Sequence, residues 1–418
     1  MLRCGLLGET LGHSYSPMIH HALGEYDYRL FEIPKEDLDA FLRSDCWDGL
    51  NVTIPYKKAV VSCCGELSKA AERLQSVNTL VHRPDGTLYG DNTDLFGFLY
   101  MVRRSGIDSA GKKALVLGSG GASVTVKAAL EQLGADVTVI SRSGPDDYDH
   151  LDRHADAQII VNTTPVGMYP HNGAAAVDLR LFPQCEGVLD IVYNPALTAL
   201  LLQAEKLNIP HAGGLSMLVA QAKRSSEQFT GTVIGDEALE RVERTVNHRL
   251  RNIILIGMPG SGKSAVAAAL GKALGREVVE ADELISQRTG MSIPEIFAEE
   301  GEEGFRQRER DAAAQLGTAN GTIISCGGGV IKNEANMDAL RQNGVVFFID
   351  RDLSQLISTD SNRPLSSSKE ALAEMYAQRI GLYRRYADVI VDNNGDIETA
   401  AEAIAAQYAQ AIHRALSE

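Results

Sequence analysis

The clearest pattern with a chemical role lies past the midpoint of the chain, where residues 257–264 read GMPGSGKS. This segment fits the phosphate-binding pattern G-x-x-x-x-G-K-[ST], and a predicted strand at 252–256 and a predicted helix at 265–274 flank it. Glycines in such a loop turn successive backbone N–H groups toward phosphate oxygens. Lys263 would neutralise the β- and γ-phosphates, and the Ser264 hydroxyl would ligate Mg²⁺.

A second nucleotide-type pattern lies in the first half. Residues 112–122 (KKALVLGSGGA) predict a strand and a glycine turn, and a helix is expected at 123–133. This is a Rossmann-like pyrophosphate site, in which we expect cofactor contacts from Gly118, Gly120, Gly121 and Ala122. A further strand at 136–140 ends at Ser141 and Arg142. Because an arginine rather than an acid follows that strand, the pattern favours a ribose 2′-phosphate and hence NADP.

Strands and helices must position these residues. Strand-like apolar runs alternate with helical stretches along almost the whole chain. The runs lie at 2–7, 114–117, 136–140, 158–161, 187–191, 253–256, 322–325 and 344–349. This alternation predicts an α/β fold with parallel layers.

Composition limits the classes of function. The chain has 418 residues and a net charge of −15, which argues against nucleic acid and anionic membranes as partners. Its six cysteines show no zinc-ligand spacing, and residue 1 leads directly into a strand without a signal-peptide pattern. We therefore expect a cytoplasmic protein with no structural metal. No apolar run approaches the roughly 18 residues that span a bilayer.

Short blocks in the first half carry a family resemblance. They are GHSYSP at 12–17, NVTIPYK at 51–57, SVNT at 76–79, GDNTD at 90–94, NTTPVGM at 162–168, DIVYNP at 190–195 and GGLSMLVAQA at 213–222. In type and order they resemble the signatures of shikimate dehydrogenases, over residues 1 to about 245. The resemblance implies a substrate-binding domain at 1–100, completed by the returning segment 215–245, and a Rossmann NADP-binding domain at 101–214.

The same resemblance implies the roles of individual residues. Reduction of a ring ketone needs a hydride and a proton donor beside the developing alkoxide. Lys57 would donate that proton, with Asp94 as its partner. Asn78 would hold a substrate hydroxyl. The remaining implied contacts are Ser14 and Ser16 to the substrate carboxylate, Thr53, Tyr193 and Gln221 completing the pocket, and Ser141, Arg142 and Gly214 to the NADP cofactor.

The second half resembles shikimate kinases from residue 251 to about 410, after an expected linker at 246–250. Its blocks are VVEAD at 278–282, GFR at 304–306, CGGGV at 326–330 and NRPL at 362–365. The resemblance implies a phosphate-loop kinase domain at 251–418 with a central parallel sheet. Its implied site comprises Gly260, Ser261, Gly262, Lys263, Ser264 and Arg363 for ATP, Ser264 and Glu280 for Mg²⁺, and Asp282, Arg306, Gly327, Gly328, Gly329 and Arg379 for shikimate. Asp282 would orient the acceptor hydroxyls, and the two arginines would clamp the carboxylate.

The chain departs from both family patterns at a few positions. They are Ser143, Asp146 and Asp147 around Arg142, Ser216 in place of a glycine, Glu280 in place of the first aspartate of D-x-D, and Ser358 in place of an arginine before the lid. The first of these bears on the choice between NADP and NAD. The last two bear on the position of Mg²⁺ and on adenine binding.

Together these patterns predict a bifunctional enzyme that reduces 3-dehydroshikimate to shikimate and then phosphorylates shikimate. Two alternatives remain at this point. One is a shikimate-binding regulator in which one or both halves are catalytically silent. The other is a quinate/shikimate dehydrogenase joined to a kinase of another acceptor. The oligomeric state stays open.

Overall fold

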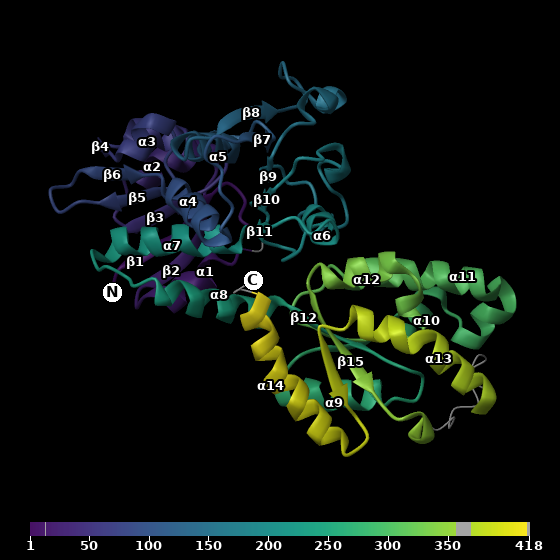
Figure 1. Ribbon diagram of the computed structural model, residues 1–418. Helices are drawn as coiled ribbons and strands as arrows, with labels where there is room; N and C mark the ends of the chain where they lie inside the picture. Colours follow the sequence, from purple (N-terminus) through teal and green to yellow (C-terminus); the bar gives the residue numbers. More distant parts are fainter. Residues whose placement is uncertain (13, 357–368, 416–418) are drawn as a thin grey trace. The chain divides into compact units, whose positions relative to one another are not determined.

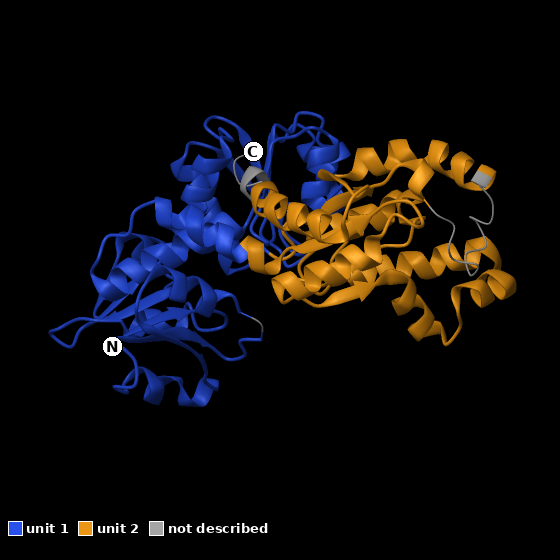
Figure 2. Ribbon diagram, turned by 90° about the horizontal axis from the view of Figure 1, so that it is seen from below, with its two compact units in different colours: residues 1–166, 175–193, 200–246 blue, residues 167–174, 194–199, 247–418 orange. Residues whose placement is uncertain are grey.

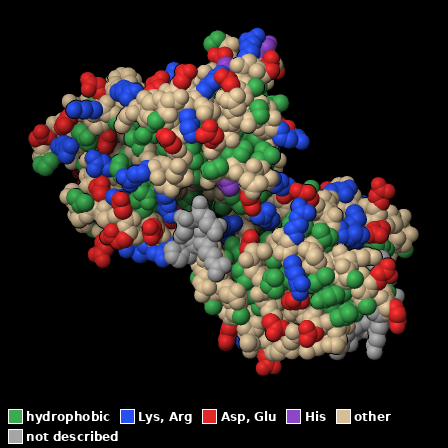
Figure 3. Space-filling view, in the orientation of Figure 1, with side chains coloured by type: hydrophobic (Ala, Val, Ile, Leu, Met, Phe, Trp, Pro, Cys, Tyr) green, Lys and Arg blue, Asp and Glu red, His purple; other side chains and the backbone are tan. Residues whose placement is uncertain are grey.

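A computed structural model of the chain describes residues 1–12, 14–356 and 369–415. The chain divides into two compact units (Figures 1 and 2). Unit 1 comprises residues 1–166, 175–193 and 200–246, and unit 2 comprises residues 167–174, 194–199 and 247–418. The face drawn in Figure 3 mixes acidic, basic and apolar side chains in each unit. Among the described residues, no helix is both long and apolar enough to cross a membrane.

The first sheet of unit 1 is mixed, with the strand order β2-β1-β3-β5-β6-β4. Strand β5 runs antiparallel to β3 and β6, so the expectation of parallel layers does not hold here. One reason is local: only residues 83–87 separate β5 from β6, and neighbouring strands joined by so short a turn run antiparallel. The strands are β1 (Arg3–Gly8), β2 (Asp27–Glu32), β3 (Gly49–Val52), β4 (Glu66–Leu67), β5 (Thr79–His82) and β6 (Leu88–Asp91), and the helices α1 (Ser16–Leu23), α2 (Leu38–Leu42) and α3 (Lys69–Leu74) accompany them.

The second sheet of unit 1 is parallel, in the order β11-β10-β9-β7-β8. This confirms the predicted Rossmann-type arrangement. Its strands are β7 (Lys113–Leu117), β8 (Asp136–Ile140), β9 (Ile159–Asn162), β10 (Gly187–Asp190) and β11 (His211–Gly213), and the helices that follow the chain here are α5 (Gly121–Gln132), α6 (Ala199–Lys206), α7 (Leu215–Thr230) and α8 (Glu237–Leu250).

Two helices connect the cores of these sheets. Helix α4 (Thr93–Ser105) starts after the first sheet and packs Phe98 and Met101 into the core of the second, so it crosses residue 100 without a break. Helix α7 places Met217 in the core of the second sheet and Phe229 in that of the first. The expected linker at 246–250 is the last turn of α8, where Val246 is buried.

Unit 2 contains a parallel sheet in the order β13-β14-β12-β15-β16. Side chains that alternate along β12 enter two cores: Ile254 packs toward α12 and α13, whereas Ile253 packs toward α9 and α14. This is the pattern of a strand buried on both faces. The elements are β12 (Asn252–Ile256), β13 (Val278–Glu280), β14 (Ile323–Ser325), β15 (Gly344–Asp350), β16 (Val389–Asp392), α9 (Lys263–Leu274), α10 (Ala281–Thr289), α11 (Ile293–Leu316), α12 (Glu334–Arg341), α13 (Lys369–Tyr386) and α14 (Ile397–Ala415).

A buried histidine gives the fold an expected pH dependence. His20 lies on α1, its ring stacks on Tyr28 with centroids 4.0 Å apart, and its Nδ1 lies 2.6 Å from the Tyr26 hydroxyl. Burial lowers the pKa of His20 to about 3. The unfolded chain takes up this proton near pH 6.5, so the free energy of unfolding should fall by up to about 1.4 kcal/mol per pH unit from this group as pH drops from 6.5 toward 3.

Urea unfolding of His20→Phe between pH 7 and pH 4 measures this contribution. The variant keeps an aromatic ring, so it should show a shallower loss of stability in acid than the wild type. His21→Gln is the matched control, because His21 is exposed on the same helix. An unchanged acid slope in His20→Phe would contradict the prediction.

Candidate active sites

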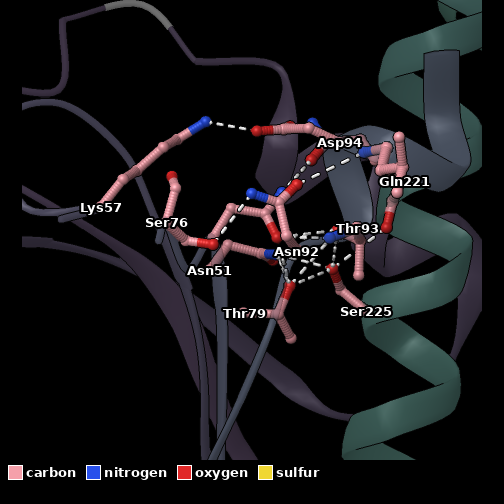
Figure 4. A network of polar contacts seen from close by, with 11 residues as sticks. Asn51, Lys57, Ser76, Thr79, Asn92, Thr93, Asp94, Gln221 and Ser225 are labelled. Carbon is pink, nitrogen blue, oxygen red and sulfur yellow. Dashed lines mark hydrogen bonds and ion pairs between the residues drawn. The ribbon is translucent and has the colours of Figure 1, made fainter. Parts of the chain in front are cut away.

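The edge of the first sheet brings Lys57 and Asp94 together. Lys57 follows β3, and Asp94 lies in the first turn of α4, directly after β6. Because β5 runs antiparallel to β3 and to β6, the ends of β3 and β6 and the start of β5 meet at one edge. The Lys57 Nζ donates to the Asp94 Oδ2 at 2.7 Å, and the side chains are 28% and 11% exposed (Figure 4). This is a partly exposed ion pair of a lysine and an aspartate.

A hydrogen-bond network joins Asn78 to Gln221 and to Thr93, which is next to Asp94 in the chain. Gln221 and Thr93 are labelled in Figure 4. The Asn78 Oδ1 accepts from the Thr93 backbone N–H at 2.7 Å, and its Nδ2 donates to the Gln221 Oε1 at 3.0 Å. With both ends of the amide engaged, the orientation of Asn78 is defined. Gln221 reaches this edge from α7, which is 143 residues further along the chain.

Sequence reasoning missed the side chains that organise this network. The Ser225 Oγ lies 2.8 Å from the Thr79 Oγ1 and 3.1 Å from the Thr93 Oγ1, and it accepts from the Asn51 Nδ2 at 2.7 Å. Ser225 stands four residues after Gln221 on α7, so both lie on the same helix face. That spacing was the available signal.

The expected carboxylate-binding serines lie at another part of the same edge. Ser14 and Ser16 follow β1 and begin α1, and the Ser16 backbone N–H donates to the Ser14 Oγ at 3.2 Å. Tyr193, which follows β10, contacts Tyr15 edge-on with ring centroids 5.6 Å apart. Burial raises the pKa of Tyr193, so its hydroxyl stays protonated and can donate to an anion. Thr53 is half-buried directly after β3, which runs parallel to β1.

The glycine turn after β7 is shaped for a ligand. Gly118 has φ +101° and its N–H donates to the Ile140 carbonyl at 2.8 Å, which places the turn against the end of β8. Gly120 caps α5 with φ −77° and ψ −175°, a conformation open to any residue. A Cβ at Gly120 or Gly121 would meet no atom of the chain within 4 Å. Close approach of a pyrophosphate at this helix N-terminus would explain both glycines.

The other expected cofactor residues have mixed surroundings. Ala122 is half-buried in the first turn of α5, Ser141 is buried, and Arg142 is exposed just beyond β8. Gly214 has a reason within the chain itself, because a Cβ there would overlap the Ile191 carbonyl. Ser216 follows it in the first turn of α7, where the chain departs from the family pattern.

Two alanine substitutions distinguish a glycine that packing requires, Gly214, from one that a ligand would require, Gly120. Gly214→Ala should destabilise unit 1 by about 1–3 kcal/mol, because the Ile191 backbone must move. Gly120→Ala should unfold like the wild type but raise the KM for the dinucleotide about tenfold, because its methyl group occupies the ligand's side of the turn. Thermal unfolding and KM measurements on both variants check this. A Gly120→Ala protein with an unchanged KM would contradict a pyrophosphate at this turn.

The predicted phosphate loop of unit 2 lies between β12 and α9. The Lys263 Nζ donates to the carbonyls of Gly257 and Met258, each at 3.0 Å, and the lysine is buried at the start of α9. Gly260 and Gly262 have φ +81° and +88°. Asn393, which the sequence did not single out, follows β16 and donates its Nδ2 to the Ser261 carbonyl at 2.6 Å. The loop is therefore held in shape by a side chain from another strand.

Ser264 and Glu280 meet at the mouth of this loop. The Ser264 Oγ donates to the Glu280 Oε2 at 3.0 Å. A hydroxyl and a carboxylate beside a phosphate loop are the oxygen ligands that Mg²⁺ uses together with water and nucleotide phosphates. The Glu280 carboxylate therefore lies within hydrogen-bond distance of Ser264, the other residue expected to hold Mg²⁺.

The residues expected to bind a carboxylate-bearing acceptor converge around the GGG turn. A Cβ at Gly327 would lie 2.7 Å from the Asp282 Oδ1, and one at Gly329 would overlap the Arg306 guanidinium. The Arg379 Nη1 donates to the Gly328 carbonyl at 2.9 Å. Glycine at positions 327 and 329 lets Asp282 and Arg306 lie against the backbone, and Arg379 contacts the same turn.

Two further residues complete this cluster. Glu309 is buried and accepts from the Arg306 Nη1 at 2.9 Å; burial raises its pKa, and Arg306 opposes that rise. Tyr383 donates its hydroxyl to the Gly328 carbonyl at 2.6 Å. Glu309 therefore holds the Arg306 guanidinium, and Tyr383 holds the carbonyl that Arg379 also contacts. Arg363 and Ser358 lie outside the described residues.

Residues of the first half are similar to known shikimate dehydrogenases. A shikimate dehydrogenase (NADP(+)) of Clostridium perfringens (strain SM101 / Type A) is 34% identical over 260 residues, which cover 57% of this chain and 96% of the relative. The Methanopyrus kandleri enzyme of the same name is 37% identical, over 54% of this chain and 89% of its own. The chain belongs to the shikimate dehydrogenase family. A family model described as the shikimate dehydrogenase substrate-binding domain matches residues 6–80, and one described as shikimate kinase matches residues 259–413.

Solved structures agree with the family. Shikimate 5-dehydrogenase from Thermus thermophilus, in complex with NADP(H) and shikimate, is 32% identical with a TM-score of 0.53, over 59% of this chain and 99% of that one. Quinate dehydrogenase from Corynebacterium glutamicum, in complex with NAD, is 28% identical with a TM-score of 0.52, over 57% and 97%. The chain is therefore an enzyme in which a shikimate dehydrogenase region is followed by a shikimate kinase domain, as predicted.

Proposed function

We propose that this enzyme reduces 3-dehydroshikimate to shikimate with NADPH and then phosphorylates shikimate to shikimate 3-phosphate with ATP and Mg²⁺. The observation that supports the proposal is that one chain holds two clusters of polar side chains, each in a unit that also contains a predicted nucleotide turn. One is the Lys57–Asp94 pair at 2.7 Å, and the other is the Asp282, Arg306 and Arg379 cluster beside the phosphate loop. In this scheme residues 1–100 with 215–245 bind the substrate, residues 101–214 bind NADP(H), and residues 251–418 form the kinase.

In the reduction, the chain's own residues place the ketone and supply the proton. NADPH supplies the hydride when bound at the glycine turn. The carbonyl oxygen gains negative charge as the carbon is reduced, and the Lys57 Nζ gives it a proton. Asp94 accepts a hydrogen bond from Lys57 and so orients the ammonium group. Asn78 is fixed to hold a ring hydroxyl, and the hydroxyls of Ser14, Ser16 and Tyr193 would bind the carboxylate.

In the phosphorylation, positioning and charge stabilisation do most of the work. The backbone of the phosphate loop and Lys263 bind the phosphates, while Ser264 and Glu280 would hold Mg²⁺. Asp282 orients the attacking hydroxyl. Arg306 and Arg379 clamp the shikimate carboxylate, because a planar guanidinium suits bidentate contact with it. Arg363 would meet the ATP phosphates.

A coupled assay tests both reactions at once. Purified protein is given 3-dehydroshikimate, NADPH, ATP and Mg²⁺, and the loss of NADPH and the formation of shikimate 3-phosphate are followed. One parallel reaction replaces NADPH with NADH, and separate oxidation reactions supply shikimate or quinate together with NADP⁺ or NAD⁺. We expect both products with the first set. Preference for quinate with NAD⁺ would instead support the second alternative, a quinate/shikimate dehydrogenase joined to a kinase of another acceptor. The likeness to quinate dehydrogenase is the observation that favours testing it. Silence of either half would support the regulatory alternative.

A further inference from the structure

The loop after β8 carries two carboxylates, Asp146 and Asp147, close to the end of that strand. The Ser141 backbone N–H donates to the Asp146 carbonyl at 3.0 Å, so residues 141–146 close on themselves beside Arg142. The end of β8 is in turn bonded to the glycine turn through Gly118. Asp146 and Asp147 are therefore held at the edge where a ribose 2′-phosphate would lie in a Rossmann-type fold. Unscreened carboxylates there would repel a phosphate dianion.

Each carboxylate is engaged by a histidine of the segment that follows. The His154 Nε2 lies 2.9 Å from the Asp146 Oδ1, and His154 is 8% exposed. The His150 Nδ1 lies 2.7 Å from the Asp147 Oδ1, with its side chain 49% exposed. Asp147 also caps the short helix at Tyr148–His154 by accepting from the Asp149 N–H at 3.0 Å. The Asp147 carboxylate is thus held by two partners, His150 and the Asp149 N–H, whereas the Asp146 carboxylate is held by the His154 side chain.

We propose that His154 is a specificity-determining residue for the reductase, which selects a 2′-phosphorylated dinucleotide by holding the Asp146 carboxylate. The hydrogen bond turns the Asp146 Oδ1 toward the buried imidazole and leaves the loop to present Arg142 to the phosphate. This inference rests on the proposed use of NADPH. In this inference the acidic residues after Arg142 pair with histidines of the segment that follows and do not recognise a ribose 2′-hydroxyl.

The test measures dissociation constants for NADP⁺ and NAD⁺ by calorimetry, so it does not depend on turnover. Wild type should bind NADP⁺ more tightly. His154→Ala should weaken NADP⁺ by about three- to tenfold and leave NAD⁺ unchanged, because a released carboxylate acts on the 2′-phosphate alone. His154→Ala with Asp146→Asn should restore the wild-type ratio. His211→Ala is the matched control, a half-buried histidine on β11, at the opposite edge of the sheet from β8, and bonded to the Ile209 carbonyl.

Three results would overturn the inference. They are a wild type that does not prefer NADP⁺, an unchanged ratio in His154→Ala, and a lowered ratio that Asp146→Asn fails to restore, which would indicate a merely structural effect. Failure of the proposed reduction is a separate outcome, seen as absent turnover in a protein that still binds NADP⁺. A protein that binds neither dinucleotide would overturn both.

Discussion

Lys57→Ala is expected to lower the rate of NADPH-dependent reduction by about 10²–10⁴-fold, the usual contribution of a positioned general acid. The ammonium group of Lys57 lies 2.7 Å from the Asp94 carboxylate at the sheet edge that also carries Asn78. Without it, the developing alkoxide must take its proton from water. The pair is partly exposed, so its loss should cost the fold at most about 1 kcal/mol.

Steady-state rates with saturating 3-dehydroshikimate and NADPH measure this effect, and kinase activity on added shikimate serves as the internal reference. Lys58→Ala is the matched control, because Lys58 is the exposed neighbour of Lys57. It should retain both activities. Wild-type reduction by Lys57→Ala would remove Lys57 from the chemistry and direct attention to the hydroxyls of the same edge.

The second large effect is expected at the phosphate loop. Lys263→Met should lower phosphorylation of shikimate by about 10²–10³-fold, because the charge that stabilises the transferred phosphoryl group is lost. Methionine is chosen because Lys263 is buried, and its chain preserves most of the packing at the start of α9. The reduction in unit 1 should continue at the wild-type rate.

Initial rates at saturating ATP and shikimate check the outcome, and thermal unfolding confirms that the variant is folded. Lys272→Ala provides the control, since it removes an exposed lysine from the last turn of the same helix. If Lys263→Met phosphorylates shikimate at the rate of the control, the loop does not act as a phosphate site.

Local patterns allowed much of the architecture to be predicted. The phosphate loop and the glycine turn are each encoded by residues within about a dozen positions, so the local pattern is enough to predict them. Apolar runs predicted β7, β8, β9 and β10 of the second sheet and β12, β14 and β15 of unit 2, whereas the short strands β11, β13 and β16 were not predicted. Strand β5 was not predicted at all, and its antiparallel direction depends on partners that the local pattern does not reveal. The separate carboxylate and arginine roles came from family resemblance and stay predictions.

The order of residue types along the chain was therefore enough to predict two phosphate-binding turns, and the ordered short blocks were enough to identify the two families. Which of those residues meet depends on the folded arrangement. Lys57 and Asp94 are 37 positions apart, and Asn78 and Gln221 are 143 positions apart, so their contacts follow from strand order and from the path of α7. Ser225, Glu309 and His154 gained their roles in the same way. Their side chains are common ones, and only the neighbours brought by packing give them a specific task.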